Sequence, residues 1–242
     1  MIPFRKPAYQ HGDTVETGGC TLRLRVNPRA RRVSLRLDRT SGEVVATAPS
    51  ARRLAEAVAF AKERAGWIAA RVAEMPPRTA LEPGLIFDLF GDPAVLEAGA
   101  GRAKLVYGPP HRIVSADDEA FSVRVLRIVK GQALKVLTER TAWHAEQLGQ
   151  PMPRVAIGDP RGRWGSCKSA TPREGASIRY SWRLALAPFE VADYVVAHEV
   201  AHLIEANHGP RFWAVVQRLY GDHKRPRAWL KLQSSRLHAF GR

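Results

Sequence analysis

Residues 191–213 read VADYVVAHEVAHLIEANHGPRFW, and this stretch sets both the fold and the chemistry expected of the carboxy-terminal half. Apolar residues recur at helical spacing at Val191, Tyr194 and Val195, which predicts a buried helix. The helix contains the pentapeptide HEVAH. Its histidines, His198 and His202, are four residues apart and therefore lie on one helix face, one turn from each other.

Two imidazoles one turn apart can converge on a single ion, and zinc is the metal that an HExxH helix typically holds. Glu199 points partly aside, so it is free to take a proton from a water that the metal makes acidic. A chance match is the alternative, because a helical histidine is usually an ordinary surface or core residue. Apolar flanks, a third histidine within one loop and a GPRFW segment that predicts a capped helix behind the site all favour the metal.

Two residues compete for the place of third ligand, Glu205 and His208. Glu205 shares the helix face but lies about 10 Å along the axis from His198, at 1.5 Å per residue. His208 can fold back if the helix ends near Ala206 and Asn207 adopts the left-handed conformation. We therefore favour His208, which leaves one coordination position open for water.

The loop GRWGSC, residues 162–167, is expected to approach the cleft. Arg163 could there contact an anionic group of the substrate or stabilise developing oxyanion charge. The alternative is a tight turn in which Gly165 permits close packing. Cys167 is expected to be small, buried and inert, since three ligands suffice for a catalytic zinc.

The periodicity of apolar residues and the positions of glycine and proline divide the chain into two regions and predict an α+β protein. Residues 1–125 are predicted to be β-rich, mainly antiparallel, with one helix at about 50–74, and the segment MPPRTALEPG at 75–84 is typical of a linker or a boundary. Residues 126–242 are predicted to form a helical catalytic domain with a small antiparallel sheet. Its expected elements are a helix to about 148, strands at 155–157 and 176–182, and helices at 188–206, 210–220 and 225–239.

The chain is strongly basic, with 38 Lys+Arg against 23 Asp+Glu and a net charge of +15, which favours anionic partners. On a predicted hairpin, arginines alternate with apolar residues and are expected to gather on the outward sheet face. These candidate anion-binding residues, for nucleic acid or a nucleotide, are Arg23, Arg25, Arg32 and Arg36. Solvated arginines on a sheet surface are the simpler alternative.

Composition gives no reason to expect a disulfide framework or a membrane-spanning protein. The two cysteines, Cys20 and Cys167, are far apart, and no stretch approaches the roughly 18 apolar residues of a spanning helix. The amino terminus also lacks the apolar core of a signal peptide. We expect a cytoplasmic protein that does not associate with membranes.

Segments along most of the chain resemble landmarks of the YgjP-like metallopeptidase family. They are RARRVSLRLD, AFAKERAGWI, RWGSC, WRLALAP, YVVAHEVAHL and NHGPRFW. The HExxH, five-residue gap, histidine and nearby phenylalanine are also similar to SprT-like and WLM proteases. The resemblance implies a zincin-type domain with a β-rich amino-terminal part, in which His198, His202 and His208 bind zinc and Glu199 is the base. Tyr180 and Ser181 depart from it, standing where an asparagine-like position is common.

Three functions are compatible with these residues. The leading one is a zinc metallopeptidase acting on protein or peptide substrates through water activated by Glu199. A second is a metal-dependent nucleoside triphosphate pyrophosphohydrolase, although no phosphate-cradling glycine loop is visible. A third is a DNA-associated protein with a structural zinc, which requires a fourth protein ligand and a closed site. Substrate preference and oligomeric state are outside what the sequence predicts.

Overall fold

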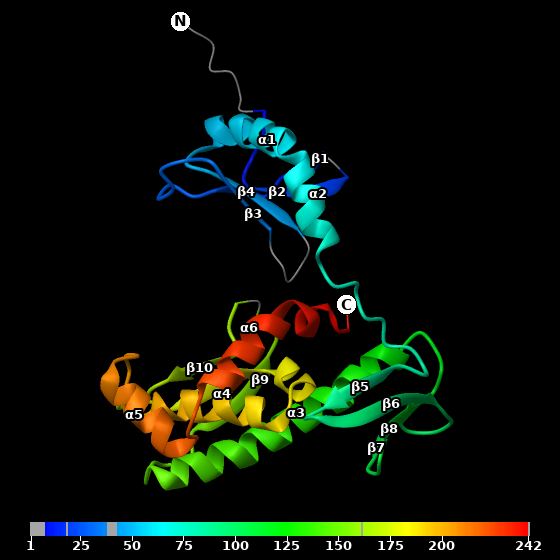
Figure 1. The fold of residues 1–242 in the computed structure, drawn as a ribbon, viewed down its shortest axis with the longest axis vertical. Helices are drawn as coiled ribbons and strands as arrows, with labels where there is room; N and C mark the ends of the chain where they lie inside the picture. Colours follow the sequence, from blue (N-terminus) through cyan, green and yellow to red (C-terminus); the bar gives the residue numbers. More distant parts are fainter. Residues whose placement is uncertain (1–7, 18, 38–42, 161, 242) are drawn as a thin grey trace, which may run out of the picture. The chain divides into compact units, whose positions relative to one another are not determined.

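The structure, a computed structural model, describes residues 8–17, 19–37, 43–160 and 162–241. The chain forms two compact units, Met1–Pro77 and Arg78–Arg242, which are described separately (Figure 1). The α+β class predicted from sequence is confirmed, because helices and strands segregate along the chain in both units.

The amino-terminal unit is a four-stranded sheet covered by helices. Its elements are β1 (Thr14–Thr17), β2 (Cys20–Val26), β3 (Ser34–Leu37), β4 (Val44–Ala48), η1 (Ala51–Arg53), α1 (Leu54–Glu63) and α2 (Ala65–Ala73). The strand order is β1-β2-β4-β3. Alternate residues such as Leu22 and Leu24 are fully buried and form one core with Leu54 and Ile68 of the helices.

This unit differs from the prediction in two respects. The helix expected at about 50–74 is interrupted at Arg64, so α1 and α2 are separate elements. The interruption falls two residues before Gly66, a poor helix former. The predicted hairpin also does not form, because β4 lies between β2 and β3, in parallel with β2 and antiparallel with β3. Strand alternation defines which face is buried but not the direction of the partner strand.

Four further strands belong to the carboxy-terminal unit. They are β5 (Ile86–Leu89), β6 (Asp92–Ala98), β7 (Lys104–Val106) and β8 (His111–Ser115), in the order β5-β6-β8-β7 with β6 and β8 parallel. The boundary between the units, at residues 77 and 78, therefore differs from the predicted one at 125 and 126. The reason is burial: Leu96 and Ile113 share one hydrophobic core with Phe121 and Val125 of the following helix. The boundary falls inside the proline-rich segment 75–84.

The remainder of this unit carries the helices and a three-stranded sheet. Its elements are α3 (Phe121–Gln147), β9 (Arg154–Gly158), β10 (Gly165–Lys168), β11 (Ser177–Ser181), η2 (Trp182–Leu186), α4 (Phe189–Ala201), α5 (Pro210–Leu219) and α6 (Lys224–Ala239). The small sheet, in the order β10-β11-β9, is mixed and not antiparallel throughout, because β11 and β9 pair in parallel. Over the described residues, none of the helices is long and apolar enough to cross a membrane.

Helices α3 and α4 are joined by a partly buried charged cluster. Asp193 of α4 accepts two hydrogen bonds from Arg140, at 2.7 and 3.1 Å, and one from Nε2 of His144 at 2.9 Å. Burial opposes ionisation of Asp193, but the hydrogen bonds from His144 and Arg140 outweigh it, so its pKa lies below the ordinary value. This cluster fixes α4 against the longest helix of the unit, one turn before His198.

Replacing Asp193 by Asn should therefore lower the free energy of unfolding by about 2 kcal/mol at neutral pH, because three charge-assisted hydrogen bonds weaken. Because the pKa of Asp193 is lower in the folded state, its carboxylate stabilises the fold at pH values above its unfolded pKa of about 3.9. This stabilisation is lost as the pH falls through the folded pKa. The difference between wild type and variant should thus shrink in acid. Urea denaturation across pH measures both effects, with Glu139→Gln on exposed α3 surface as control. A pH-independent difference would contradict this role for Asp193.

Candidate metal centre

The HEVAH motif lies at the carboxy-terminal end of α4, on the helix that the sequence predicts, although the helix is shorter. It ends at Ala201, with His202 as its C-cap. The imidazoles of His198 and His202 are 5.2 Å apart between ring centroids. Because α4 is buried along most of its length, the two rings are held by a helix with little freedom to move.

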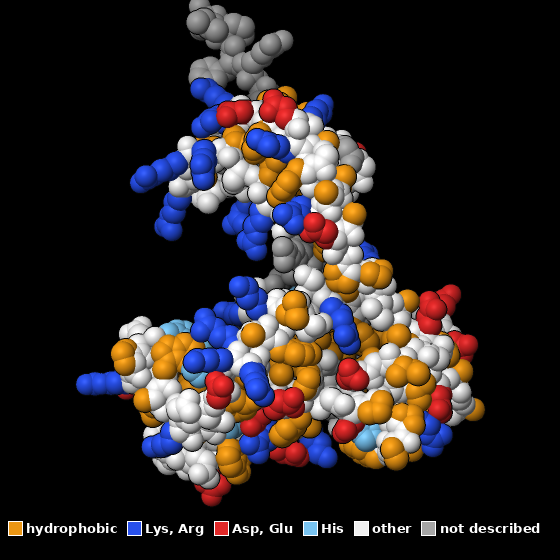
Figure 2. All heavy atoms as spheres, viewed as in Figure 1, with side chains coloured by type: hydrophobic (Ala, Val, Ile, Leu, Met, Phe, Trp, Pro, Cys, Tyr) orange, Lys and Arg blue, Asp and Glu red, His pale blue; other side chains and the backbone are white. Residues whose placement is uncertain are grey.

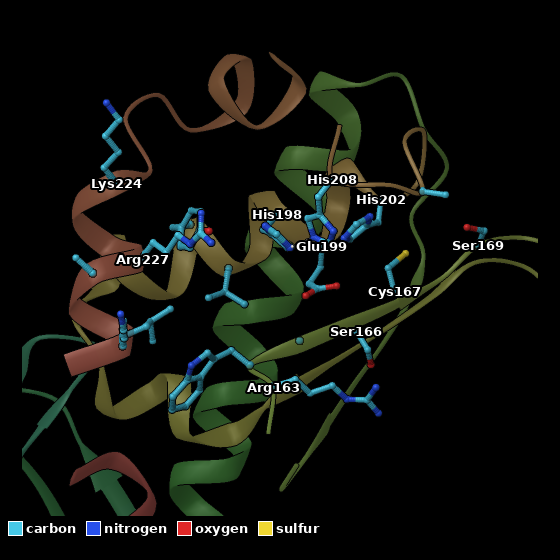
Figure 3. A pocket seen from close by; sticks show the side chains of 18 residues that line it. Arg163, Ser166, Cys167, Ser169, His198, Glu199, His202, His208, Lys224 and Arg227 are labelled. Carbon is cyan, nitrogen blue, oxygen red and sulfur yellow. Dashed lines mark hydrogen bonds between the residues drawn. The ribbon is translucent and has the colours of Figure 1, made fainter. Parts of the chain in front are cut away.

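His208 returns to the motif through the loop after α4. Its Nε2 lies 3.0 Å from Nε2 of His198 (Figure 3). The return does not use the predicted left-handed Asn207, because Phe90 is the only non-glycine residue with positive φ among the described residues. Since the helix already ends at Ala201, the loop has enough residues to turn back without such a conformation.

The three histidines form the one cluster of possible metal ligands among the residues that the structure describes. One nitrogen from each lies within 4.8 Å of the others. In a tetrahedral site, zinc–nitrogen bonds of about 2.0–2.1 Å place ligand nitrogens about 3.4 Å apart, so a shift of about 1 Å by each ring would let all three share one ion. The donor set therefore fits zinc.

The protonation of the imidazoles also suits a metal. Nδ1 of His202 donates to the backbone carbonyl oxygen of Glu205 at 3.0 Å, which leaves Nε2 with its lone pair for an ion. Burial, reinforced by His202 and His208, lowers the pKa of His198 to about 3, and burial lowers that of His202 too. The neutral imidazole is the form that binds metal. Glu205 thus contributes its main chain here, and its carboxylate is outside the histidine cluster.

Helix α5 supports the three rings from behind. Gly209 precedes it and Pro210 occupies its first turn, as the sequence predicts. Phe212 is fully buried, and its ring centroid lies 4.8 Å from that of His198, 4.5 Å from His202 and 4.6 Å from His208. One aromatic side chain thus contacts all three imidazoles and limits how far any of them can rotate.

Glu199 lies on the opposite side of the cluster and faces strand β10. It is 6% exposed, and burial raises its pKa to about 7 against the effects of Arg163 and of the Cys167 backbone N–H, which donates to the carboxylate. A Cβ at Gly165 would lie 2.5 Å from Cγ and Oε1 of Glu199. The carboxylate therefore occupies the space that any other residue at position 165 would fill.

The histidines and Glu199 line an open cleft of about 1050 Å³. Figure 3 shows Lys224 and Arg227 of α6 on one side of the histidines and Arg163, Ser166 and Cys167 on the other. Arg163 borders the cleft as predicted, but its side chain points away from the histidines (Figure 3). A cleft of this size accommodates several residues of a polypeptide.

Some functional features were not recognised in the sequence. The segment 165–168 was expected to be loop but forms β10, paired with β11, because its short GSCK run carries no clear alternation. The cleft cations of α6 were also missed, although Lys224, Arg227 and Lys231 have helical spacing. Cys167 is half-buried and lines the cleft; burial, with a contribution from Glu199, raises its pKa to about 11, which agrees with an inert thiol.

The two positions that depart from the family pattern lie outside the cleft. Tyr180 is fully buried and its hydroxyl lies 2.9 Å from Oγ1 of Thr141. Ser181 is also buried, and its hydroxyl accepts a hydrogen bond from the backbone N–H of Arg183. Both residues therefore serve the packing of β11 and η2.

The model of the YgjP-like metallopeptidase domain matches residues 31–233 of this chain, which is most of its length. The chain belongs to the YgjP-like metallopeptidase family. The resemblance noted from sequence is thereby confirmed, and the YgjP-like match covers α4, β10 and His208.

Two further comparisons accompany the YgjP-like assignment. The crystal structure of the metallopeptidase zymogen of Pyrococcus abyssi abylysin is similar, with 18% sequence identity and a TM-score of 0.33. The similarity covers 40% of this chain and 92% of that one. A search of curated proteins finds no match.

Three of the predicted anion-binding arginines lie together on the amino-terminal unit. Arg23 and Arg25 of β2 and Arg36 of β3 point to the exposed face of the sheet, where Arg23 and Arg36 are both in register with Val45. Figure 2 shows Lys and Arg side chains gathered on one side of this unit. Arg23 is bound to Glu43 at 2.6 Å.

Arg32 does not share this face. It borders a small hollow with Arg53 and Glu56 at the start of the helices. The alternation expected from RVSLRLD begins only with β3 at Ser34, so Arg32 lies in the preceding turn. Anion binding by the four arginines stays a prediction.

Zinc should stabilise the fold, and His208 should be needed for this effect. At a free zinc concentration about 100 times Kd, binding contributes about 2.7 kcal/mol and raises Tm measurably. His208→Ala should abolish the rise, and His111→Gln, remote from the cluster, should retain it. Thermal unfolding with and without chelator measures the shift. An equal rise in the His208 variant would remove it from the ligand set.

Gly165→Ala should separate catalysis from metal binding, because the three atoms nearest the added methyl group all belong to the Glu199 side chain, which it displaces. We expect kcat/KM to fall by on the order of 100-fold, as for about 1 Å of misplacement of a catalytic group, while zinc content is unchanged. Gly162→Ala is the matched control, since its Cβ would meet no atom within 4 Å. Full activity of the Gly165 variant would show that Glu199 need not occupy its present position.

Proposed function

We propose that this chain is a zinc-dependent peptidase in which His198, His202 and His208 hold the metal and Glu199 is the general base. The observation that carries the proposal is the convergence of three imidazole nitrogens within 4.8 Å, beside a buried carboxylate, at an open cleft. Membership of a metallopeptidase family supports it.

A zinc ion bound there would supply a Lewis acid that polarises both a water molecule and the scissile carbonyl group. Glu199 accepts a proton from the attacking water through its carboxylate. It then delivers the proton to the amide nitrogen, which leaves as an amine. Burial suits both steps, because a carboxylate whose pKa is raised toward 7 is a stronger base and, once protonated, still a useful acid near neutral pH.

The cleft walls would position the polypeptide. Gly165 to Lys168 form an edge strand of the small sheet beside Glu199, and α6 forms the other wall. Arg163 stays a candidate for substrate or oxyanion contact. Such a contact would require its side chain to swing from the direction that Figure 3 shows.

The alternatives have less support. A structural zinc needs a fourth protein ligand, and within the described part of the chain the cluster contains three histidines. A nucleoside triphosphate pyrophosphohydrolase would use the same metal and base, and the basic cleft is compatible with it, but family membership favours the peptidase. Nucleic-acid binding through the amino-terminal arginines and a cytoplasmic location stay predictions.

Glu199→Gln should retain zinc and lose peptide hydrolysis by at least about 1,000-fold, because the amide cannot accept a proton. Glu205→Gln, which preserves the carbonyl bonded to His202, is the control and should remain active. Zinc-loaded proteins are compared on an unfolded protein substrate and on nucleoside triphosphates. Nucleotide turnover with no proteolysis would favour the pyrophosphohydrolase, and loss of zinc from Glu205→Gln would reinstate Glu205 as a ligand.

The pH dependence of kcat/KM should show an acid limb that reports Glu199. Only the carboxylate form accepts a proton, so activity falls as pH decreases through its pKa. Burial places that pKa at about 7, and a bound cation lowers it. The midpoint should therefore lie between 7 and the ordinary value of about 4.3. A midpoint that is unchanged in Glu199→Asp would assign the limb to another group.

A further inference from the structure

Helix α6 presents a row of cations to the cleft. Lys224, Arg227 and Lys231 follow one another at helical spacing, and all three line the cleft together with the smaller Ala228. At 1.5 Å per residue the row extends over about 10 Å, roughly the length of three residues of an extended peptide. Figure 3 shows Lys224 and Arg227 on the α6 side of the histidines.

The charge of this row is not balanced within the cleft. Among the described lining residues the one carboxylate is Glu199, which the proposed reaction uses. Within the same described part, no acidic side chain forms a salt bridge with the charged ends of Lys224, Arg227 or Lys231. The nearby Asp222 accepts a hydrogen bond from the backbone N–H of Lys224 at 3.0 Å. Figure 2 shows Lys and Arg side chains beside histidines on the carboxy-terminal unit. An anionic partner would therefore meet no competing carboxylate on α6.

Arg227 connects the row to the metal centre. Its guanidinium carbon lies 5.6 Å from the centroid of a ring of Trp213. Trp213 in turn lies 5.9 Å from His198 and 6.0 Å from His208 between ring centroids. The tryptophan thus holds the middle cation of the row next to the histidines, within reach of a residue close to the scissile bond.

The cleft is better suited to a polypeptide than to a nucleic acid strand. Single-strand binding uses free aromatic faces on which bases stack. The aromatic lining residues are Trp164 and Tyr194, and each already packs on another ring: Trp164 on His238 at 5.2 Å, and Tyr194 on His223 at 6.2 Å. The apolar remainder of the lining, such as Val195 and Leu230, suits a peptide with both acidic and apolar residues.

We propose that α6 is a specificity wall that selects polypeptides with acidic residues on one side of the scissile bond, through Lys224, Arg227 and Lys231. This inference rests on the proposed peptidase function. The attraction is between exposed charges, so it is screened by salt and contributes most at low ionic strength.

The test uses zinc-loaded full-length protein and quenched fluorescent peptides with one cleavable centre. Each peptide carries two Glu, two Gln or two Lys residues. In one series these residues lie on the amino-terminal side of the cleavable bond, and in the other series they lie on its carboxy-terminal side. We expect kcat/KM for Glu to exceed that for Gln by about tenfold on one side only, with Lys below Gln, and the ratio to fall as salt is added. Lys224→Gln/Arg227→Gln/Lys231→Gln should reduce the Glu-to-Gln ratio to about one.

The matched control is Lys104→Gln/Lys135→Gln/Arg225→Gln, which removes the same number and kind of charges from exposed positions outside the cleft lining and should keep the ratio. Binding of the same peptides to zinc-loaded Glu199→Gln, followed by fluorescence anisotropy, gives a readout that does not need turnover. Equal binding of Glu and Gln peptides there, or equal ratios in the two triple variants, overturns the inference.

A further arm adds single-stranded DNA as competitor. Strong inhibition by DNA, together with no preference for Glu peptides, would assign the row to nucleic acid and also overturn the inference. Absence of cleavage of every peptide by the wild-type protein would instead overturn the peptidase proposal, so the two failures are distinguishable.

Discussion

The site depends on the convergence of three imidazoles from one helix end and the loop that follows it. Two of the rings are placed by helical geometry alone, because residues four apart share a face. The third has to be returned by the chain, and the close approach of His208 to His198 shows where the return ends. Three imidazole nitrogens gathered at one point suit a divalent cation, which can accept a lone pair from each of them.

This convergence is maintained by packing on two sides. Behind the rings, buried Phe212 contacts all three imidazoles. In front, the absence of a side chain at Gly165 lets β10 approach Glu199 closely enough to bury its carboxylate. Farther along α4, Asp193 fixes the helix to α3 through Arg140 and His144. A catalytic group held in this way has few alternative positions, which is the condition for efficient proton transfer.

The sequence predicted the elements best where apolar residues recur at helical spacing and where glycine or proline marks the ends of the element. Helix α5, between Gly209 and Gly221, was predicted almost to the residue, and the α+β class was confirmed. Predictions were wrong where only pairing partners or packing decide. The segment 165–168 forms a strand where the sequence predicts a loop, each of the three sheets contains one parallel pair, and the β5–β8 strands belong to the carboxy-terminal unit. The alternation of apolar and polar residues in a strand does not indicate whether its partner is parallel or antiparallel, because both arrangements place alternate residues on opposite faces of the sheet.

From the sequence alone one could infer the chemistry of the centre: the residue types, their helical spacing, the histidine available as third ligand and the resemblance to a metallopeptidase family. These are local properties, since four-residue spacing on a helix specifies a common face whatever surrounds it. Tertiary contacts were needed to show that His208 returns to His198, that Gly165 leaves room for Glu199, and that α6 brings its cations to the same cleft. Such relations join residues ten or more positions apart, and they follow from how elements pack together and not from the pattern within any one of them.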